Sequence, residues 1–230
     1  METERRFQAT ESTGEVSAVL LLPDGARCVL VLGHGAGAGM RHPFLECVAQ
    51  RLARSGIGTF RYQFPYWERG RRRPDPRPVL LATVRAAVDA AAAAAEGLPL
   101  LAGGKSMGGR MTSLAAAAAP LPGVRGLVFL GFPLHPAGKP STERGDHLKE
   151  VRLPMLFLQG TRDKLADLEL VGPLLEPLDE RATLHVVEGA DHSFHVLKRS
   201  GRTDDEVLDE LTRVTREWTL EVVGAVVPEA

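Results

Sequence analysis

Short apolar runs alternate with stretches of helical periodicity along most of this chain. The run Cys28–Leu32 has the length and β-branched content of a buried strand, and it stops at Gly33. Phe44–Arg54 follows, with apolar residues at the spacing of one helix face. Strands that alternate with helices are joined by crossover connections, so this pattern predicts βαβ units and a mainly parallel sheet.

The remaining segments continue the alternation. Further strands are expected at Val16–Leu22, Gly58–Tyr62, Leu98–Ala102, Leu127–Leu130, Met155–Leu158 and Leu184–Val187. Further helices are expected at Val79–Glu96, Arg110–Ala119 and Asp204–Val223. The last of these is amphipathic and predicts packing against the sheet. We therefore expect a three-layer α/β fold with helices on both faces of the sheet.

Two connections are longer than the others. Pro65–Pro78 contains four prolines, which excludes a regular helix or a central strand there. Gly131–Leu153 is long enough for a flap over a site but too short for a separate cap domain. We expect residues 1–230 to form a single domain without a large cap.

Composition excludes several classes of protein. Of the 230 residues, 44% are hydrophobic and 25% are charged, which is typical of a globular chain. The net charge of -1 offers no overall basic field for nucleic acid or an anionic membrane. Two cysteines cannot form a disulfide framework or a four-cysteine zinc site. The acidic N-terminus and the lack of a long apolar run predict a cytoplasmic protein with reduced thiols and no membrane partner.

The segment Gly104-Lys105-Ser106-Met107-Gly108 fits the pattern G-x-S-x-G between a predicted strand and a predicted helix. A nucleophilic serine on a sharp turn needs small residues two positions to either side, and a helix N-terminus stabilises developing negative charge there. The alternative is a glycine-rich turn with an ordinary serine. A phosphate-binding loop is excluded, because position 99 is Pro99 where that motif needs glycine.

A serine nucleophile needs a base and an acid, which follow it in chain order in this kind of site. Asp163 and His192 each come just after a predicted strand, where open α/β sheets build their sites. We expect His192 to accept the Ser106 proton and Asp163 to orient the imidazole. Other candidates stay open: Asp167 and Asp191 for the acid, and His195 and His185 for the base. No cysteine or carboxylate cluster accompanies these histidines, so no metal is expected.

The glycine-rich segment His34–Gly39 follows the strongest early strand. We expect the backbone N–H groups of Ala36 and Met107 to form an oxyanion hole. The alternative for this segment is a dinucleotide-binding loop. Lys105 either raises the local positive potential or simply packs or points to solvent.

Two further segments are candidates for substrate contact. Phe132, Leu134 and His135 follow a strand end and are predicted to line an acyl pocket, with core packing as the alternative. The loop Arg69–Arg73 is basic. It is either a solvated loop or a clamp for an anionic substrate.

Four motifs together resemble the α/β-hydrolase superfamily: His34-Gly35-Ala36-Gly37, Gly104-Lys105-Ser106-Met107-Gly108-Gly109-Arg110, Gly160-Thr161-Arg162-Asp163 and Asp191-His192-Ser193-Phe194. More narrowly, with Phe64-Pro65-Tyr66 and Gly131–Pro136, they resemble its dienelactone-hydrolase-like or NSL-complex-subunit-three-like branch. The resemblance runs from about Val16 to Val222. Dienelactone hydrolases proper use a cysteine where this chain has Ser106, which argues against that activity. Larger relatives of the subunit-three type resemble scaffold proteins.

Together these features predict a serine hydrolase that acts on a small acyl ester or thioester without a cofactor. An acyltransferase is a neighbouring possibility. The alternative from another class is a non-catalytic interaction module that retains the fold. The oligomeric state is open.

Overall fold

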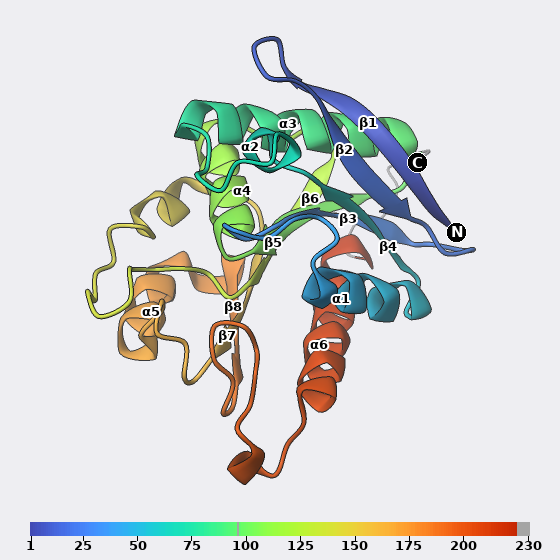
Figure 1. The fold of residues 1–230 in the computed structure, drawn as a ribbon. Coiled ribbons are helices and arrows are strands. Elements are labelled where there is room, and N and C mark those ends of the chain that lie inside the picture. The colour runs from blue at the N-terminus through green and yellow to red at the C-terminus, as the bar shows by residue number, and fades with distance from the viewer. Residues whose placement is uncertain (96, 225–230) are drawn as a thin grey trace.

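The computed structural model describes residues 1–95 and 97–224, and its centre is an eight-stranded sheet (Figure 1). The strands are β1 (Glu2–Thr10), β2 (Gly14–Leu21), β3 (Cys28–Gly33), β4 (Ile57–Tyr62), β5 (Leu100–Lys105), β6 (Val124–Leu130), β7 (Met155–Gly160) and β8 (Ala182–Val187). They lie in the order β1-β2-β4-β3-β5-β6-β7-β8. All pairs among β3 to β8 are parallel, whereas β2 is antiparallel to β1 and to β4. The predicted mainly parallel sheet is confirmed.

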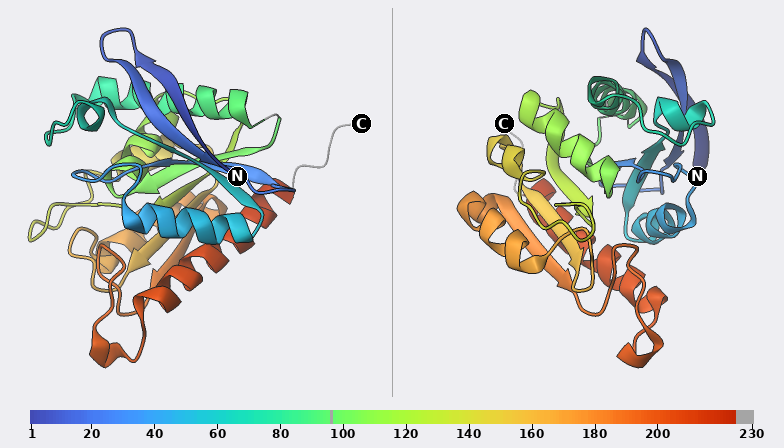
Figure 2. Two further views of the ribbon diagram at one scale, coloured as in Figure 1. Left: turned by 45° about the vertical axis from the view of Figure 1, so that its right-hand side comes forward. Right: turned by 60° about the vertical axis from the view of Figure 1, so that its left-hand side comes forward.

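Helices cover both faces of this sheet (Figure 2). They are α1 (Pro43–Arg54), α2 (Pro65–Glu68), α3 (Arg77–Ala94), α4 (Met107–Ala118), α5 (Leu168–Leu175) and α6 (Asp204–Gly224). Short 3-10 helices span Asp146–Glu150, Glu176–Arg181 and Lys198–Ser200. Among the described residues, no helix is long and apolar enough to cross a membrane.

The alternation of side chains along β3 divides the core into two layers. Val29 and Val31 join the core beneath α3 and α4, whereas Leu30 and Leu32 join the core beneath α1 and α6. Strands buried on both faces are near-continuous apolar runs, which is why these strands were visible in the sequence. The connection from β6 to β7 carries one 3-10 helix, so the expected lack of a large cap is confirmed.

Several predicted boundaries were wrong. Strand β5 and helix α4 meet at Ser106, whereas the prediction ended the strand at Ala102 and began the helix at Arg110. The helix predicted to reach Glu96 ends at Ala94, and Glu96 itself lies outside the described residues. Strand β1 was not predicted. Only Phe7 and Ala9 of β1 are buried, because it lies at the edge of the sheet, and such a polar strand has no clear apolar pattern.

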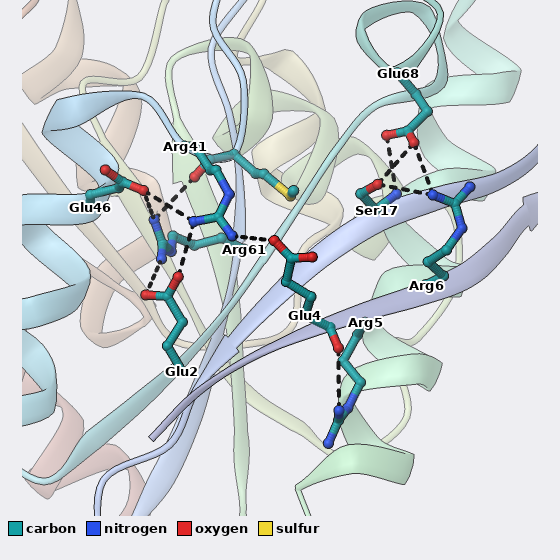
Figure 3. A network of polar contacts seen from close by, with 10 residues as sticks. Glu2, Glu4, Arg5, Arg6, Ser17, Arg41, Glu46, Arg61 and Glu68 are labelled. Atoms are coloured by element: carbon teal, nitrogen blue, oxygen red, sulfur yellow. Dashed lines mark hydrogen bonds and ion pairs between the residues drawn. The ribbon is translucent and has the colours of Figure 1, made fainter.

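Ion pairs tie β1 to the segment that follows β3 (Figure 3). The side chain of Arg61 on β4 is 1% exposed and lies 3.3 Å from Glu2 and 3.5 Å from Glu46. Its Nη1 also donates to the carbonyl of Met40 at 3.2 Å. Arg41 pairs with Glu2 at 3.0 Å. This network fixes the end of the glycine-rich connection between β3 and α1.

Candidate active site

Ser106 lies on a sharp turn between β5 and α4. Its backbone has φ 51° and ψ −116°, a left-handed conformation that is strained for a residue with a side chain. A Cβ atom added to Gly104 or to Gly108 would lie 2.2 Å from the carbonyl oxygen of Gly33. Glycine is therefore required at both positions, because β3 passes directly against this turn. The local geometry is that of a nucleophile elbow.

The structure brings Ser106, His192 and Asp163 into one chain of hydrogen bonds. The distance from Ser106 Oγ to His192 Nε2 is 2.9 Å, and that from His192 Nδ1 to Asp163 Oδ2 is 2.7 Å. Asp163 follows β7 and His192 follows β8, so all three lie at the carboxyl edge of the sheet. Because a carboxylate only accepts, Nδ1 carries the imidazole proton and Nε2 is free to accept from the serine hydroxyl.

The Asp163 side chain has no exposed surface and is held by other donors as well. The backbone N–H of Leu165 donates to Oδ1 at 2.8 Å, and Gln159 Nε2 donates to Oδ2 at 2.5 Å. Gln159 also accepts from the N–H of Phe132 at 2.9 Å. Sequence reasoning missed Gln159, although a polar residue inside the apolar strand β7 is the signal that points to it.

A cavity of about 320 Å³ opens beside the serine. Its lining includes Ser106 and His192, and the apolar side chains of Ala36, Phe44 and Leu165. The volume is at the small end of ligand-binding pockets. It suits a short, largely apolar group.

The predicted oxyanion donors lie on the two segments that flank the serine. Ala36 lines the cavity. Met107 is the first residue of α4, where a backbone N–H has no carbonyl partner within the helix. Their role as donors to an oxyanion stays a prediction.

His34 holds the glycine-rich connection in place. Its Nδ1 donates to the carbonyl of Gly35 at 2.8 Å, and its Nε2 accepts from the N–H of Phe64 at 3.1 Å. Burial lowers the pKa of His34 to about 4, so the ring is neutral. A neutral ring with one donor and one acceptor links the connection after β3 to the one after β4.

The predicted acyl-pocket residues lie elsewhere. Phe132 is 4% exposed, and its ring packs 5.5 Å from that of Phe129. Leu134 is fully buried in the same core. His135 Nε2 accepts from the N–H of Asp167 at 2.9 Å. None of the three predicted residues lines the cavity beside Ser106, because the segment after β6 turns inward, where its apolar side chains gain burial.

The alternative acids and bases have other partners. Asp167 accepts from the N–H of Glu169 at the start of α5, and Asp191 accepts from the N–H groups of Ser193 and His195. The side chains of His195 and His185 pair with Asp204 and Glu210. Within the described residues, no three histidine, cysteine or acidic side chains come together as a metal site.

A second serine–histidine hydrogen bond, 2.7 Å between Ser113 Oγ and His147 Nε2, runs in the wrong direction for catalysis. Ser113 is fully buried within α4, and its hydroxyl donates to the carbonyl of Arg110 at 2.9 Å. His147 Nε2 must therefore donate to Ser113 and cannot take its proton. Burial and two nearby arginines lower the pKa of His147 to about 4.

The basic loop after α2 is mostly solvated. Arg69 donates to the carbonyl of Thr13 at 2.6 Å. Arg71, Arg72 and Arg73 are exposed and do not line the cavity beside Ser106. A clamp for an anionic substrate at this loop stays a prediction.

Comparison with known proteins agrees with this fold. Residues 26–220 match the model of the family described as the alpha/beta hydrolase domain. A dienelactone hydrolase from Anabaena variabilis is similar in structure, with a TM-score of 0.76, 21% identity and coverage of 96% of this chain and 98% of that one. An α/β serine hydrolase without a lid from Xanthomonas campestris has a TM-score of 0.72, 22% identity and coverage of 94% of each chain.

The esterase domain of a Rhodothermus marinus protein has a TM-score of 0.71 and 16% identity, and the match covers 97% of this chain and all of that one. At these identities the structural similarity establishes the fold, while the family model matches the larger part of the sequence. The chain belongs to the α/β-hydrolase family.

Proposed function

We propose that this chain is a serine hydrolase that cleaves small acyl esters. The observation that carries the proposal is the unbroken hydrogen-bond chain from buried Asp163 through His192 to Ser106. It joins a nucleophile on a strained turn to a base in the right tautomer and to a carboxylate that holds the base in place.

In the first half of the reaction, Ser106 Oγ attacks the carbonyl carbon of the ester while His192 Nε2 takes the hydroxyl proton. The carbonyl electron pair moves onto oxygen, where the N–H groups of Ala36 and Met107 stabilise the charge. When the tetrahedral intermediate collapses, the bond to the alcohol oxygen breaks. The departing alcohol takes the proton from Nε2, which leaves an acyl group on Ser106.

In the second half, water replaces the alcohol. His192 Nε2 takes one proton from the water as its oxygen attacks the acyl carbon. Collapse breaks the bond to Ser106 Oγ, which recovers its proton from Nε2, and the acid is released. Asp163 stays ionised and stabilises the imidazolium in both halves.

The size and lining of the cavity support a small substrate. Its volume of about 320 Å³ and its apolar walls favour a short acyl or alcohol group. An esterase domain and a dienelactone hydrolase are among the similar structures, which supports an ester as the bond that is cleaved.

Covalent labelling with a fluorophosphonate, measured by intact mass, tests the proposal. We expect the wild type and Ser113→Ala to gain one label and Ser106→Ala to gain none. Labelling of Ser106→Ala would identify another nucleophile. A folded wild type that takes no label would instead favour the non-catalytic module.

A further inference from the structure

Lys105 connects the nucleophile turn to the histidine loop, which we define as residues 188–196. It directly precedes Ser106 at the end of β5. Its Nζ donates to the backbone carbonyl of His192 at 2.6 Å. The turn that carries Ser106 and the loop that carries His192 are therefore linked twice. One link joins the side chains of Ser106 and His192, and the other joins the side chain of Lys105 to the backbone of His192.

The ammonium group of Lys105 lies against two aromatic rings and the histidine loop, and the residue also lines the cavity beside Ser106. Its Nζ lies 6.0 Å from the ring centroid of Phe44 and 5.5 Å from that of Phe194. These two rings are stacked, with centroids 5.6 Å apart. A Cβ atom on Gly131 would lie 3.1 Å from Nζ, a tight contact that glycine avoids.

Partial burial of a lysine has an energetic cost. Burial lowers the pKa of Lys105 to about 8, although the carboxylates of Asp163 and Asp191 act in the opposite direction. The amine is still largely protonated at neutral pH. The hydrogen bond to the His192 carbonyl offsets part of this cost, whereas an apolar side chain in the same space would leave that carbonyl without this donor.

Apart from the bond between His192 Nε2 and Ser106 Oγ, the other polar contacts described for the histidine loop join it to itself, to the turn after β7 or to residues 202–204. Asp191 closes the loop on itself, through N–H groups of Ser193 and His195 that donate to its carboxylate. The carbonyl of Ala190 accepts from the backbone N–H of Arg162 at 2.9 Å, which fixes the base of the loop to the turn after β7. The bond from Lys105 ties the catalytic end of the loop to β5.

We propose that Lys105 is a positioning residue for the hydrolysis. By holding the carbonyl of His192, it keeps Nε2 within reach of Ser106 Oγ and opposes any rise of the loop away from the nucleophile. The inference rests on the proposed function, because it assigns Lys105 a role in that same site.

The test compares Lys105→Met with Lys149→Met, a matched change at an exposed lysine on the 3-10 helix Asp146–Glu150. Methionine keeps an apolar stem between the rings but has no donor. We expect the fluorophosphonate labelling rate and kcat of Lys105→Met to fall about 10- to 100-fold, the range expected for a misplaced base, with KM little changed. Lys149→Met should behave as the wild type.

A second readout does not require activity. The His192 Nδ1 proton shared with Asp163 should give a far-downfield proton NMR signal that is missing in His192→Ala. We expect Lys105→Met to weaken or broaden this signal, because a freed loop lets the imidazole leave the carboxylate. A merely structural role for Lys105 would lower stability and leave the signal of the folded protein intact.

Chemical rescue provides a variant that keeps the test valid if Lys105→Met does not fold. Alkylation of Lys105→Cys with 2-bromoethylamine rebuilds a side chain of lysine length with an ammonium end, and ethylation rebuilds the same stem without the ammonium. We expect the first to restore labelling and the second not to. Wild type treated in parallel controls for alkylation of Cys28, which is buried, and Cys47, which is partly buried.

The outcomes separate the two proposals. Wild-type labelling with an unchanged rate in folded Lys105→Met, or equal recovery with both alkyl groups, overturns the role of Lys105 and leaves the hydrolase standing. If the wild type takes no label, the proposed hydrolase fails. The NMR signal then decides: its loss in Lys105→Met supports the positioning role, and its persistence overturns it.

Discussion

Replacing Gln159 with leucine tests whether the carboxylate of the site is held by a buried amide. Gln159 makes two buried hydrogen bonds, one to Asp163 Oδ2 and one from the N–H of Phe132. Loss of a hydrogen bond to a charged group costs about 1.5–3 kcal/mol, and an unpaired buried N–H costs about 1–3 kcal/mol. Burial of leucine recovers part of this, so we expect Gln159→Leu to lower the free energy of unfolding by about 2–4 kcal/mol.

Urea unfolding at pH 7 measures this change, and the fluorophosphonate labelling rate of the folded variant gives a second readout. Asp163 keeps its bonds to Leu165 and His192, so labelling should slow without being abolished. Gln50→Leu, at an exposed position on α1, is the matched control and should change stability by about 0.5 kcal/mol or less. A loss below about 1 kcal/mol for Gln159→Leu would refute the reasoning that these bonds are strong and unreplaced.

Three more predictions follow from the packing and charge of the site. Gly104→Ala places a Cβ 2.2 Å from a backbone oxygen of Gly33, so it should cost about 3 kcal/mol or more or yield insoluble protein, whereas Gly172→Ala, with open space around it, should not lower the melting temperature. The pKa of His34 is lowered to about 4 in the folded state against about 6.5 in the unfolded state. Neutral His34 therefore contributes about 3 kcal/mol to the free energy of unfolding above pH 6.5, and this contribution is lost as the pH falls toward 4. Urea unfolding at pH 7 and pH 4.5 should therefore show a smaller loss of stability on acidification for His34→Gln than for the wild type. An equal loss in the two proteins would contradict a neutral buried ring. Phe132→Ala should lower the free energy of unfolding by about 3–5 kcal/mol without raising KM for a small ester. A raised KM with unchanged stability would show instead that Phe132 contacts the substrate.

The sequence was informative where the constraint is local. Strands such as Cys28–Gly33 are buried on both faces, and their apolar runs are therefore visible without a structure. The elbow was visible through the glycine spacing around Ser106, although the backbone that demands Gly104 and Gly108 is that of Gly33 on the neighbouring strand β3. Chain order and strand ends pointed to Asp163 and His192, which the structure brings together.

Contacts between distant segments were not visible in the sequence. The edge strand β1 carries few buried residues, and its partners Arg61 and Arg41 come much later in the chain. Phe132 was predicted in the pocket because it follows a strand end, but whether such a side chain turns toward the cavity or the core depends on packing with Phe157.

The sequence alone therefore determined the class of sheet, the turn at Ser106 and the leading candidates for its two partners, because strand periodicity, glycine spacing and chain order are visible without the fold. Only the tertiary structure decided what holds those partners in place. Gln159 beside Asp163 and Lys105 beside His192 act through contacts across neighbouring strands and loops. Such contacts depend on register and on the direction of a side chain, which emerge only when the whole sheet is assembled.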